Sequence, residues 1–236
     1  MGEKQTRVFS PEVEDYLKAI YELQQDGQTV TTTAVSKVVG RPAASVSKMF
    51  RYLSELHLID HARYQGVRLT PAGEKVALEV IRHHRLLELY LHQALGYSWD
   101  EVDAEAEKLE HHISEEFERR IEHMLDYPDV DPHGDPIPAR DGTIAPLRGI
   151  PLSDAEPGEL LVVLRVKDQN PDVLRYLARI GIRLDAAIEV VAKQPFNGPL
   201  DIQVAGERHA IGRELAGHVF VERQDRPGDA PVAEAS

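Results

Sequence analysis

Hydrophobic side chains recur at helical spacing in the first quarter of the chain. After a Ser-Pro pair, Val13, Leu17 and Ile20 fall three or four residues apart, and acidic residues occupy the first turn. The same spacing returns in 34–39 and in 43–56, and a Gly-Arg-Pro turn separates these two segments. The pattern predicts three helices, of which the last two are joined by a tight turn.

Two short apolar runs follow the third predicted helix. Residues 58–59 and 67–69 are typical of strands, and the Tyr-Gln-Gly sequence at 64–66 is typical of a tight turn between them. Thr70 and Pro71 then suit the cap and the first position of another helix. Helices, a turn, a further helix and a hairpin in this order predict a winged helix-turn-helix.

The rest of the chain changes character twice. From residue 70 to 125 nearly every segment has helical spacing, with one interruption around 96–98. Residues 126–157 are rich in Pro, Asp and Gly, which is typical of a linker. Across 159–222, short β-rich runs alternate with turns around one predicted helix at 171–180. This last region predicts a small β-barrel.

Charge is distributed unevenly along the chain, whose formal net charge is −13. Residues 1–75 carry ten Lys and Arg against nine Asp and Glu, whereas residues 76–148 carry seven against seventeen. Within 37–68, six basic residues stand against two acidic ones. Because local charge decides the attraction to phosphate, the acidic total does not argue against DNA binding by the helix-turn-helix.

The third predicted helix has the composition of a helix that enters the major groove. Its outer face carries short hydroxyl side chains and long cations, and its other face is apolar. The start of the preceding helix offers hydroxyls and amides to a phosphate, and two arginines flank the hairpin turn. The alternative is a charged protein–protein module. The candidate DNA-binding residues are Thr32, Thr33, Arg41, Ser45, Ser47, Lys48, Arg51, Arg63 and Arg68.

The chain contains no cysteine, which excludes disulfides, thiol catalysis and cysteine-based zinc or iron–sulfur sites. No apolar run reaches the roughly 20 residues of a membrane span, and no apolar signal core stands at the start, so we expect a cytoplasmic protein. Because the chain has no cysteine, any metal must be held by oxygen atoms and imidazole nitrogens.

Acidic and histidine side chains recur at helical spacing in the acidic middle of the chain. Glu107, Glu110 and His111 stand three and four residues apart, on what the pattern predicts to be one helix that continues to Phe117. His84 and a glutamate four residues later repeat this spacing, and a carboxylate of the first helix completes a site if that helix packs nearby. Carboxylates with imidazole and no sulfur favour Mn²⁺ or Fe²⁺, although solvated surface groups are the alternative.

Six segments form one series along the chain. They are VEDYLKAIY at 13–21, AASVSKM at 43–49, LTPAG at 69–73, HRLLE at 84–88, EKLEHHIS at 107–114 and GDPIP at 134–138. The series resembles the iron- and manganese-dependent repressors, the diphtheria-toxin-repressor family. The last region is similar to the SH3-like domain of the longer members.

The resemblance implies a mainly α protein with some β structure. The implied parts are a winged helix-turn-helix DNA-binding domain (1–75), a helical metal-binding and dimerisation domain that ends in a Pro-rich linker (76–148), a small SH3-like β-barrel of the FeoA type (149–223) and a disordered tail (224–236).

The resemblance also implies the ligands of a divalent metal. The primary site would use Asp15, Glu107, Glu110 and His111, and a neighbouring site would use His84, Glu88 and Asp103. Iron-type members carry Met and Cys at the positions of Asp15 and Glu107, so the two carboxylates here favour Mn²⁺ over Fe²⁺. Lys18 stands where manganese-type members usually have a carboxylate, which puts a two-metal cluster in doubt; this lysine could instead pair with a nearby carboxylate.

The implied function is that of a Mn²⁺-responsive repressor of metal-uptake genes, in which metal promotes the binding of a homodimer to a palindromic operator. The leucine-rich run at 86–91 also favours a dimer, because its apolar surface exceeds what one helical face buries. Alternatives are an Fe²⁺-responsive regulator and a winged-helix regulator that senses a non-metal ligand. A metal-dependent hydrolase lacks support, since no H-E-x-x-H motif is present. We therefore expect that the protein is not an enzyme.

Overall fold

A computed structural model describes residues 9–25, 27, 29–62 and 66–224 of the chain. The chain divides into two compact units, which we describe separately. The first unit comprises residues up to 87, 106–127 and 137–144, and the second comprises 88–105, 128–136 and the residues from 145 onward. The predicted tail falls almost entirely on 225–236, outside the described residues, as do the turn residues 64–65 and Arg63.

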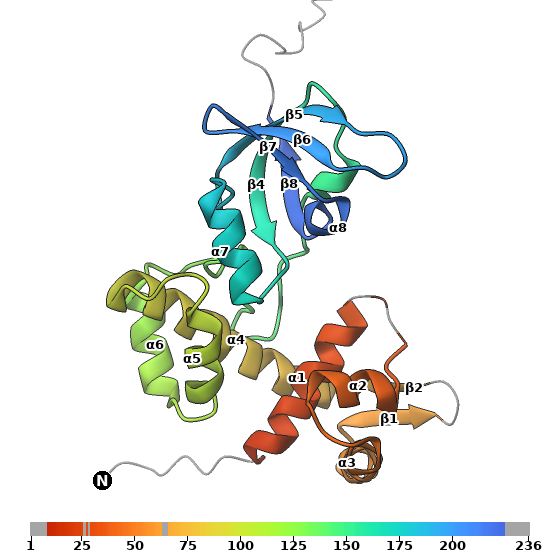
Figure 1. Cartoon of the computed structure of the whole chain (residues 1–236). Coiled ribbons are helices and arrows are strands. Elements are labelled where there is room, and N and C mark those ends of the chain that lie inside the picture. Colours follow the sequence, from red (N-terminus) through yellow and green to blue (C-terminus); the bar gives the residue numbers. More distant parts are fainter. Residues whose placement is uncertain (1–8, 26, 28, 63–65, 225–236) are drawn as a thin grey trace, which may run out of the picture. The chain divides into compact units, whose positions relative to one another are not determined.

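The first unit contains the winged helix-turn-helix that the sequence predicts (Figure 1). Its elements are α1 (Pro11–Gln25), α2 (Thr32–Val38), α3 (Ala43–Glu55), β1 (Ile59–Ala62) and β2 (Gly66–Leu69). The two strands pair antiparallel, with Ile59 opposite Leu69. Helix α1 packs against both α2 and β2, and α3 packs against α2 and β1.

Polar caps begin the helices where the sequence predicts. Ser10 Oγ accepts a hydrogen bond from Val13 N at 3.4 Å, and Thr31 Oγ1 accepts one from Ala34 N at 3.0 Å. Thr70 Oγ1 accepts from the amide of the third residue after it at 3.2 Å. Each cap satisfies an amide that has no partner within its own helix.

The winged-helix core is built from the apolar faces of these elements. Leu17 and Ile20 of α1 are fully buried, together with Val46 and Leu53 of α3. Phe50 completes the stripe on α3, whereas Met49 beside it is only partly buried. The buried face leaves the polar side of α3 exposed, as the spacing predicts.

Three helices follow the wing. They are α4 (Pro71–Leu95), α5 (Val102–Leu109) and α6 (Glu115–Met124). The prediction of one helix that carries Glu107, Glu110 and His111 and continues to Phe117 is wrong. Helix α5 ends at Leu109, and Ser114 caps a new helix by accepting from Phe117 N at 3.2 Å. Glu110 and His111 therefore lie in the turn between α5 and α6, and Phe117 is exposed rather than part of an apolar stripe.

The leucine-rich part of α4 does not carry the dimer argument made from sequence. Leu86, Leu87, Leu89 and Leu91 are each at most 6% exposed within the single chain, and Tyr90 is half-buried. These leucines are buried within the single chain, so they need no partner copy to cover them.

The second unit contains a six-stranded sheet with the order β3-β8-β4-β5-β6-β7 (Figure 1). Its elements are β3 (Ile150–Pro151), η1 (Leu152–Asp154), β4 (Leu160–Val166), α7 (Pro171–Arg179), β5 (Ala187–Lys193), β6 (Leu200–Val204), β7 (Glu207–Ile211), α8 (Arg213–Ala216) and β8 (Val219–Arg223). The strands pair antiparallel, and alternate residues such as Val163, Val190 and Ile202 form the core. No helix of the described residues is long and apolar enough to cross a membrane.

The loop at 128–136 lies against strand β4 within the second unit. Val166 N donates to the carbonyl of His133 at 2.9 Å. Gly134 follows with φ +89°, and a Cβ at this position would lie 2.0 Å from the carbonyl oxygen of Leu164. The close approach of loop and strand thus requires glycine here.

Candidate metal centre

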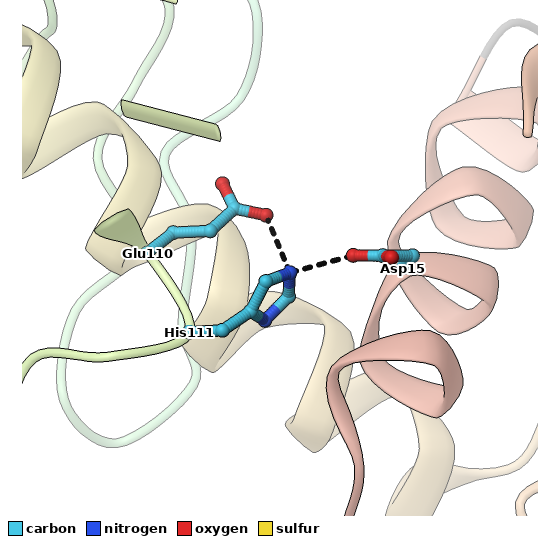
Figure 2. Close-up of side chains that lie close together, drawn as sticks. All are labelled: Asp15, Glu110 and His111. Carbon is cyan, nitrogen blue, oxygen red and sulfur yellow. Dashed lines mark hydrogen bonds and ion pairs between the residues drawn. The ribbon is translucent and has the colours of Figure 1, made fainter. Parts of the chain in front are cut away.

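Three of the predicted ligands converge within the first unit. Nε2 of His111 lies 2.6 Å from Oδ1 of Asp15, on α1, and 3.4 Å from Oε1 of Glu110. Figure 2 shows the imidazole between the two carboxylates, with one nitrogen directed at both. The ligating atoms of these three residues all lie within 4.8 Å of one another. Glu110 is fully buried, and the side chain of Asp15 is 41% exposed.

The other nitrogen of His111 also meets a carboxylate of α1. Nδ1 lies 2.7 Å from Oε2 of Glu14, a buried residue. Burial lowers the pKa of His111, but the hydrogen bonds to Asp15 and Glu14 outweigh burial and raise the pKa to about 9. In this arrangement Glu14 fixes the orientation of the ring and leaves Nε2 for the site, as carboxylates behind metal-binding histidines do.

Glu110 also belongs to a second group, in which the ligating atoms of His84, Glu107 and Glu110 lie within 4.8 Å of one another. Nζ of Lys18 contacts all three side chains, at 3.2 Å, 2.8 Å and 2.9 Å respectively. Burial lowers the pKa of Lys18, but the charges of Glu110 and Glu107 outweigh burial and raise it. Burial raises the pKa of Glu110, but the hydrogen bond from His84 and the Lys18 charge bring it below its usual range.

The donor atoms of the first group fit a divalent metal ion. They comprise two carboxylates and one imidazole, of which Asp15 comes from α1 and the other two from the turn after α5, and they are only partly open to solvent. Hard oxygen donors with one imidazole suit Mn²⁺ and Fe²⁺, and the group contains no sulfur ligand that would favour softer ions. Asp15, Glu110 and His111 are thus the residues that would hold such an ion.

The structure divides the predicted primary set. Asp15 approaches the turn after α5, as the predicted site requires, but Glu107 lies with His84 around Lys18 instead of with Asp15. The predicted neighbouring site draws His84 from the first unit and Glu88 and Asp103 from the second, and it stays a prediction.

Glu14 and His133 were not among the site residues predicted from the sequence. Glu14 precedes a predicted ligand, so the chain offers a carboxylate pair at 14–15, of which only one was chosen.

His133 is 3% exposed in the second unit, and its Nε2 lies 3.5 Å from Oε1 of Glu88. Its ring stacks on Trp99 with the centroids 5.7 Å apart. The signal for His133 was a histidine between two aspartates in the linker, a segment for which no role was predicted.

A buried ionic network supports the turn that carries Glu110. Arg82 of α4 donates to Oε1 of Glu118 at 2.6 Å and to the carbonyl of Pro138 at 2.6 Å. His83 lies 3.3 Å from Oε2 of Glu118, and its other nitrogen lies 3.2 Å from the carbonyl of Glu110. Burial raises the pKa of Glu118, but its bonds to His83 and Arg82 lower it to about 2.

The predicted DNA-binding residues lie mostly on exposed surface of the winged helix. Among the described residues, Thr32 is half-buried, and the side chain that caps α2 belongs to Thr31. Lys37 and Tyr52 are exposed on the same helices and were not selected from the sequence. The exposed predicted residues are Thr33, Arg41, Ser45, Ser47, Lys48, Arg51 and Arg68.

Three family models match the chain in order. The N-terminal DNA-binding domain of the iron-dependent repressors matches residues 8–67, and their metal-binding and dimerisation domain matches residues 70–139. The FeoA domain matches residues 150–223. The iron-dependent repressor IdeR of Mycobacterium bovis is 30% identical over 226 residues, which cover 89% of this chain and 96% of the relative. The chain belongs to the iron-dependent repressor family.

Further relatives include a repressor named for a toxin and two solved structures of regulators named for manganese. The diphtheria toxin repressor of Corynebacterium diphtheriae is 28% identical over 219 residues, covering 89% of this chain and 96% of the relative. A solved manganese-dependent transcriptional repressor in complex with manganese is 38% identical, with a TM-score of 0.84, 90% of this chain covered and 100% of that chain. The manganese regulator SloR is 29% identical, with a TM-score of 0.75 and coverage of 92% and 100%.

Membership of the iron-dependent repressor family establishes the general activity. The protein is a metal-dependent transcriptional repressor that binds DNA through its winged helix and forms a homodimer through the domain at 70–139. A divalent metal ion is its co-effector. The SH3-like domain predicted for the C-terminal region is the FeoA domain.

Proposed function

We propose that this repressor responds to Mn²⁺ and that Asp15, Glu110 and His111 hold the ion. The chemistry of the donors supports Mn²⁺, because two carboxylates and an imidazole form a hard, oxygen-rich set. Fe²⁺ accepts the same donors, and the names of the relatives include both metals. A test of the proposal must therefore compare the two ions.

The contact between α1 and the turn after α5 carries this proposal. Asp15 and His111 are 96 positions apart in sequence, yet Oδ1 and Nε2 face each other at 2.6 Å. Two residues later on the same helix, Leu17 belongs to the winged-helix core. An ion held by Asp15 and His111 would thus fix α1, and with it α3, to the segment that forms the dimer.

Fixing the winged helix in this way would prepare the homodimer for its operator. Two recognition helices held at one spacing match a palindromic DNA site, whose half-sites repeat with the helical turn. We expect α3 to contact bases through Ser45, Ser47, Lys48 and Arg51, and we expect Arg41 and Arg68 to contact phosphates. Repression of metal-uptake genes follows if the ion is both the signal and the transported cargo.

The proposal is tested by measuring operator affinity with Mn²⁺, with anaerobic Fe²⁺ and with a chelator. A set of operator fragments is first selected from promoter DNA by the protein in the presence of Mn²⁺. We expect Mn²⁺ to strengthen binding by about 5- to 150-fold, the usual range for coupled sites. His111→Ala should abolish the effect of the ion, whereas His112→Ala, which changes the exposed neighbour, should retain it.

Two results would contradict the proposal. Equal operator affinity in the presence of Mn²⁺ and of chelator would show that these ligands do not couple metal to DNA. A response to Fe²⁺ without a response to Mn²⁺ would keep the site but assign it to the other ion.

A further inference from the structure

Glu110 is shared by two adjoining groups of ligating side chains. One carboxylate oxygen faces His111 in the group with Asp15, and the other faces His84 in the group with Glu107. Both groups have the donor chemistry of a divalent cation site, because each contains two carboxylates and one imidazole.

The second group already contains a cation, the ammonium of Lys18. Nζ lies 2.8 Å from Oε2 of Glu107, 2.9 Å from Oε2 of Glu110 and 3.2 Å from Nδ1 of His84. An ammonium has three N–H donors, and three carboxylate oxygens accept from this one: one of Glu107 and both of Glu110. The contacts therefore satisfy its hydrogen-bonding capacity.

We infer that Lys18 is a tethered cation that takes the place of a second divalent ion, so that the centre holds one Mn²⁺ per subunit. The inference rests on the proposed function, since it concerns the same centre. It adds that a side chain of this protein sets the number of ions bound.

Burial and charge support this assignment. The Lys18 side chain is 12% exposed, and the Glu110 side chain is fully buried, so bulk water screens the charge of neither group effectively. A buried carboxylate needs a nearby cation, and the Lys18 ammonium supplies one to Glu110. An ion between His84 and Glu107 would need the same lone pairs and would be repelled by the ammonium.

The spacing along α1 links the two groups. Asp15 and Lys18 stand three residues apart, so one face of the helix carries a ligand for the first group and a cation for the second. The same helix thus contacts the turn after α5 in both groups, through the Lys18 ammonium at Glu110 and through Asp15 at His111.

The inference is tested by counting bound Mn²⁺ with equilibrium dialysis and by electron paramagnetic resonance of the full chain. We compare the unmodified protein with Lys18→Glu, which supplies a ligand in place of the cation, and with Lys18→Gln, which removes only the charge. Lys108→Glu is the matched control, because it makes the same charge change on α5 at an exposed position. Circular dichroism establishes that each variant is folded.

We expect Lys18→Glu to bind one more Mn²⁺ per subunit than the unmodified chain. Its spectrum should show exchange coupling between two ions that share the Glu110 carboxylate. Lys18→Gln should gain the same ion with lower affinity, and it serves alone if Lys18→Glu does not fold. Lys108→Glu and the unmodified chain should show only uncoupled Mn²⁺.

Two outcomes would overturn the inference while the proposed function stands. One is an unchanged number of bound ions in the folded Lys18 variants, and the other is a coupled Mn²⁺ pair in the unmodified chain. If no chain binds Mn²⁺, the proposed function fails and the inference fails with it.

Discussion

Each ring nitrogen of His111 faces a carboxylate of the same helix. Asp15 lies at Nε2 and Glu14 at Nδ1, so adjacent residues of α1 hold the ring from both sides. The two carboxylates differ in exposure, since Glu14 is buried and Asp15 is half-exposed. The buried residue is therefore suited to orient the ring, and the exposed one is suited to bind an ion that arrives from solvent.

Glu14→Gln should weaken Mn²⁺ binding without removing a ligand. Partners behind a metal-binding histidine typically change metal affinity by about 10- to 100-fold, because they fix the tautomer and the ring orientation. Isothermal titration with Mn²⁺ measures the change. Glu12→Gln, an exposed residue in the same first turn of α1, is the control and should match the unmodified chain. Equal losses in both variants would argue against an orienting role for Glu14.

The low pKa of Glu118 makes the free energy of unfolding depend on pH in the acid range. Its pKa falls from an ordinary 4.5 to about 2, so its stabilising effect is complete above pH 4.5 and is lost as the pH falls toward 2. Glu118→Gln should lower the free energy of unfolding by roughly 2 kcal/mol at neutral pH, because Arg82 loses one of its charged partners.

The loss caused by Glu118→Gln should shrink as the pH falls below 4.5, because the unmodified carboxyl then becomes protonated on unfolding. Urea unfolding at several pH values measures this dependence. Glu116→Gln, on the exposed side of α6, should change stability by less than about 0.5 kcal/mol. A loss for Glu118→Gln that stays constant down to pH 3 would contradict the assignment.

At the scale of elements, α3 presents its cations to the outside and its apolar residues to the core. Lys48→Ala and Arg51→Ala should each weaken operator binding and lower the salt dependence of the affinity, by about 0.9 in the log–log slope for each phosphate that the variant no longer neutralises. Fluorescence anisotropy at several salt concentrations provides both quantities. Glu55→Gln, exposed near the end of α3, serves as the control and should not reduce the slope.

The loop at 128–136 depends on one glycine. Gly134→Ala would place a Cβ against the carbonyl of Leu164 at a positive φ, whereas Gly142, with φ +84°, has open space around it. Both alanine variants bear the backbone strain, but only the first meets the strand. We expect Gly134→Ala to destabilise the protein by about 2 kcal/mol more than Gly142→Ala in thermal unfolding. Equal effects would show that φ alone matters.

Helix starts and the hairpin followed from local chemistry, and for that reason the sequence predicted them well. Ser10 and Thr70 cap helices through bonds to residues three positions away, which a sequence displays directly. The break after Leu109 contains no Gly or Pro, and the helical spacing continues through it. This spacing masked the one local signal of a new helix start, Ser114 followed by two glutamates.

Contacts between distant segments explain what the sequence could not provide. Helical spacing alone did not show that Lys18 would divide the predicted ligands by taking Glu107 and His84. The burial of Leu89 and Leu91 likewise depends on elements elsewhere in the chain. The family resemblance supplied Asp15 as a ligand, and the structure supplied its contact with His111.

At the scale of the whole molecule, the candidate ligands and the winged helix lie in the same compact unit. Saturation with Mn²⁺ at 100 times its Kd should stabilise the folded form by about 2.7 kcal/mol. Hydrogen exchange should show this as added protection in α1 and around Glu110, with little change in strands β4 to β8. Uniform protection of both units, or none, would contradict a site confined to the first unit.

Helix α1 contributes side chains both to the winged-helix core and to the ligand group. Thermodynamic linkage makes this arrangement act in both directions, so operator DNA must raise the affinity for the ion by the factor with which the ion raises the affinity for DNA. A repressor molecule already seated on a promoter would release its ion at a lower free metal concentration than one in solution. Promoters with stronger operators would consequently stay repressed for longer during metal starvation. A single protein would thus determine the order in which the genes that it controls are expressed.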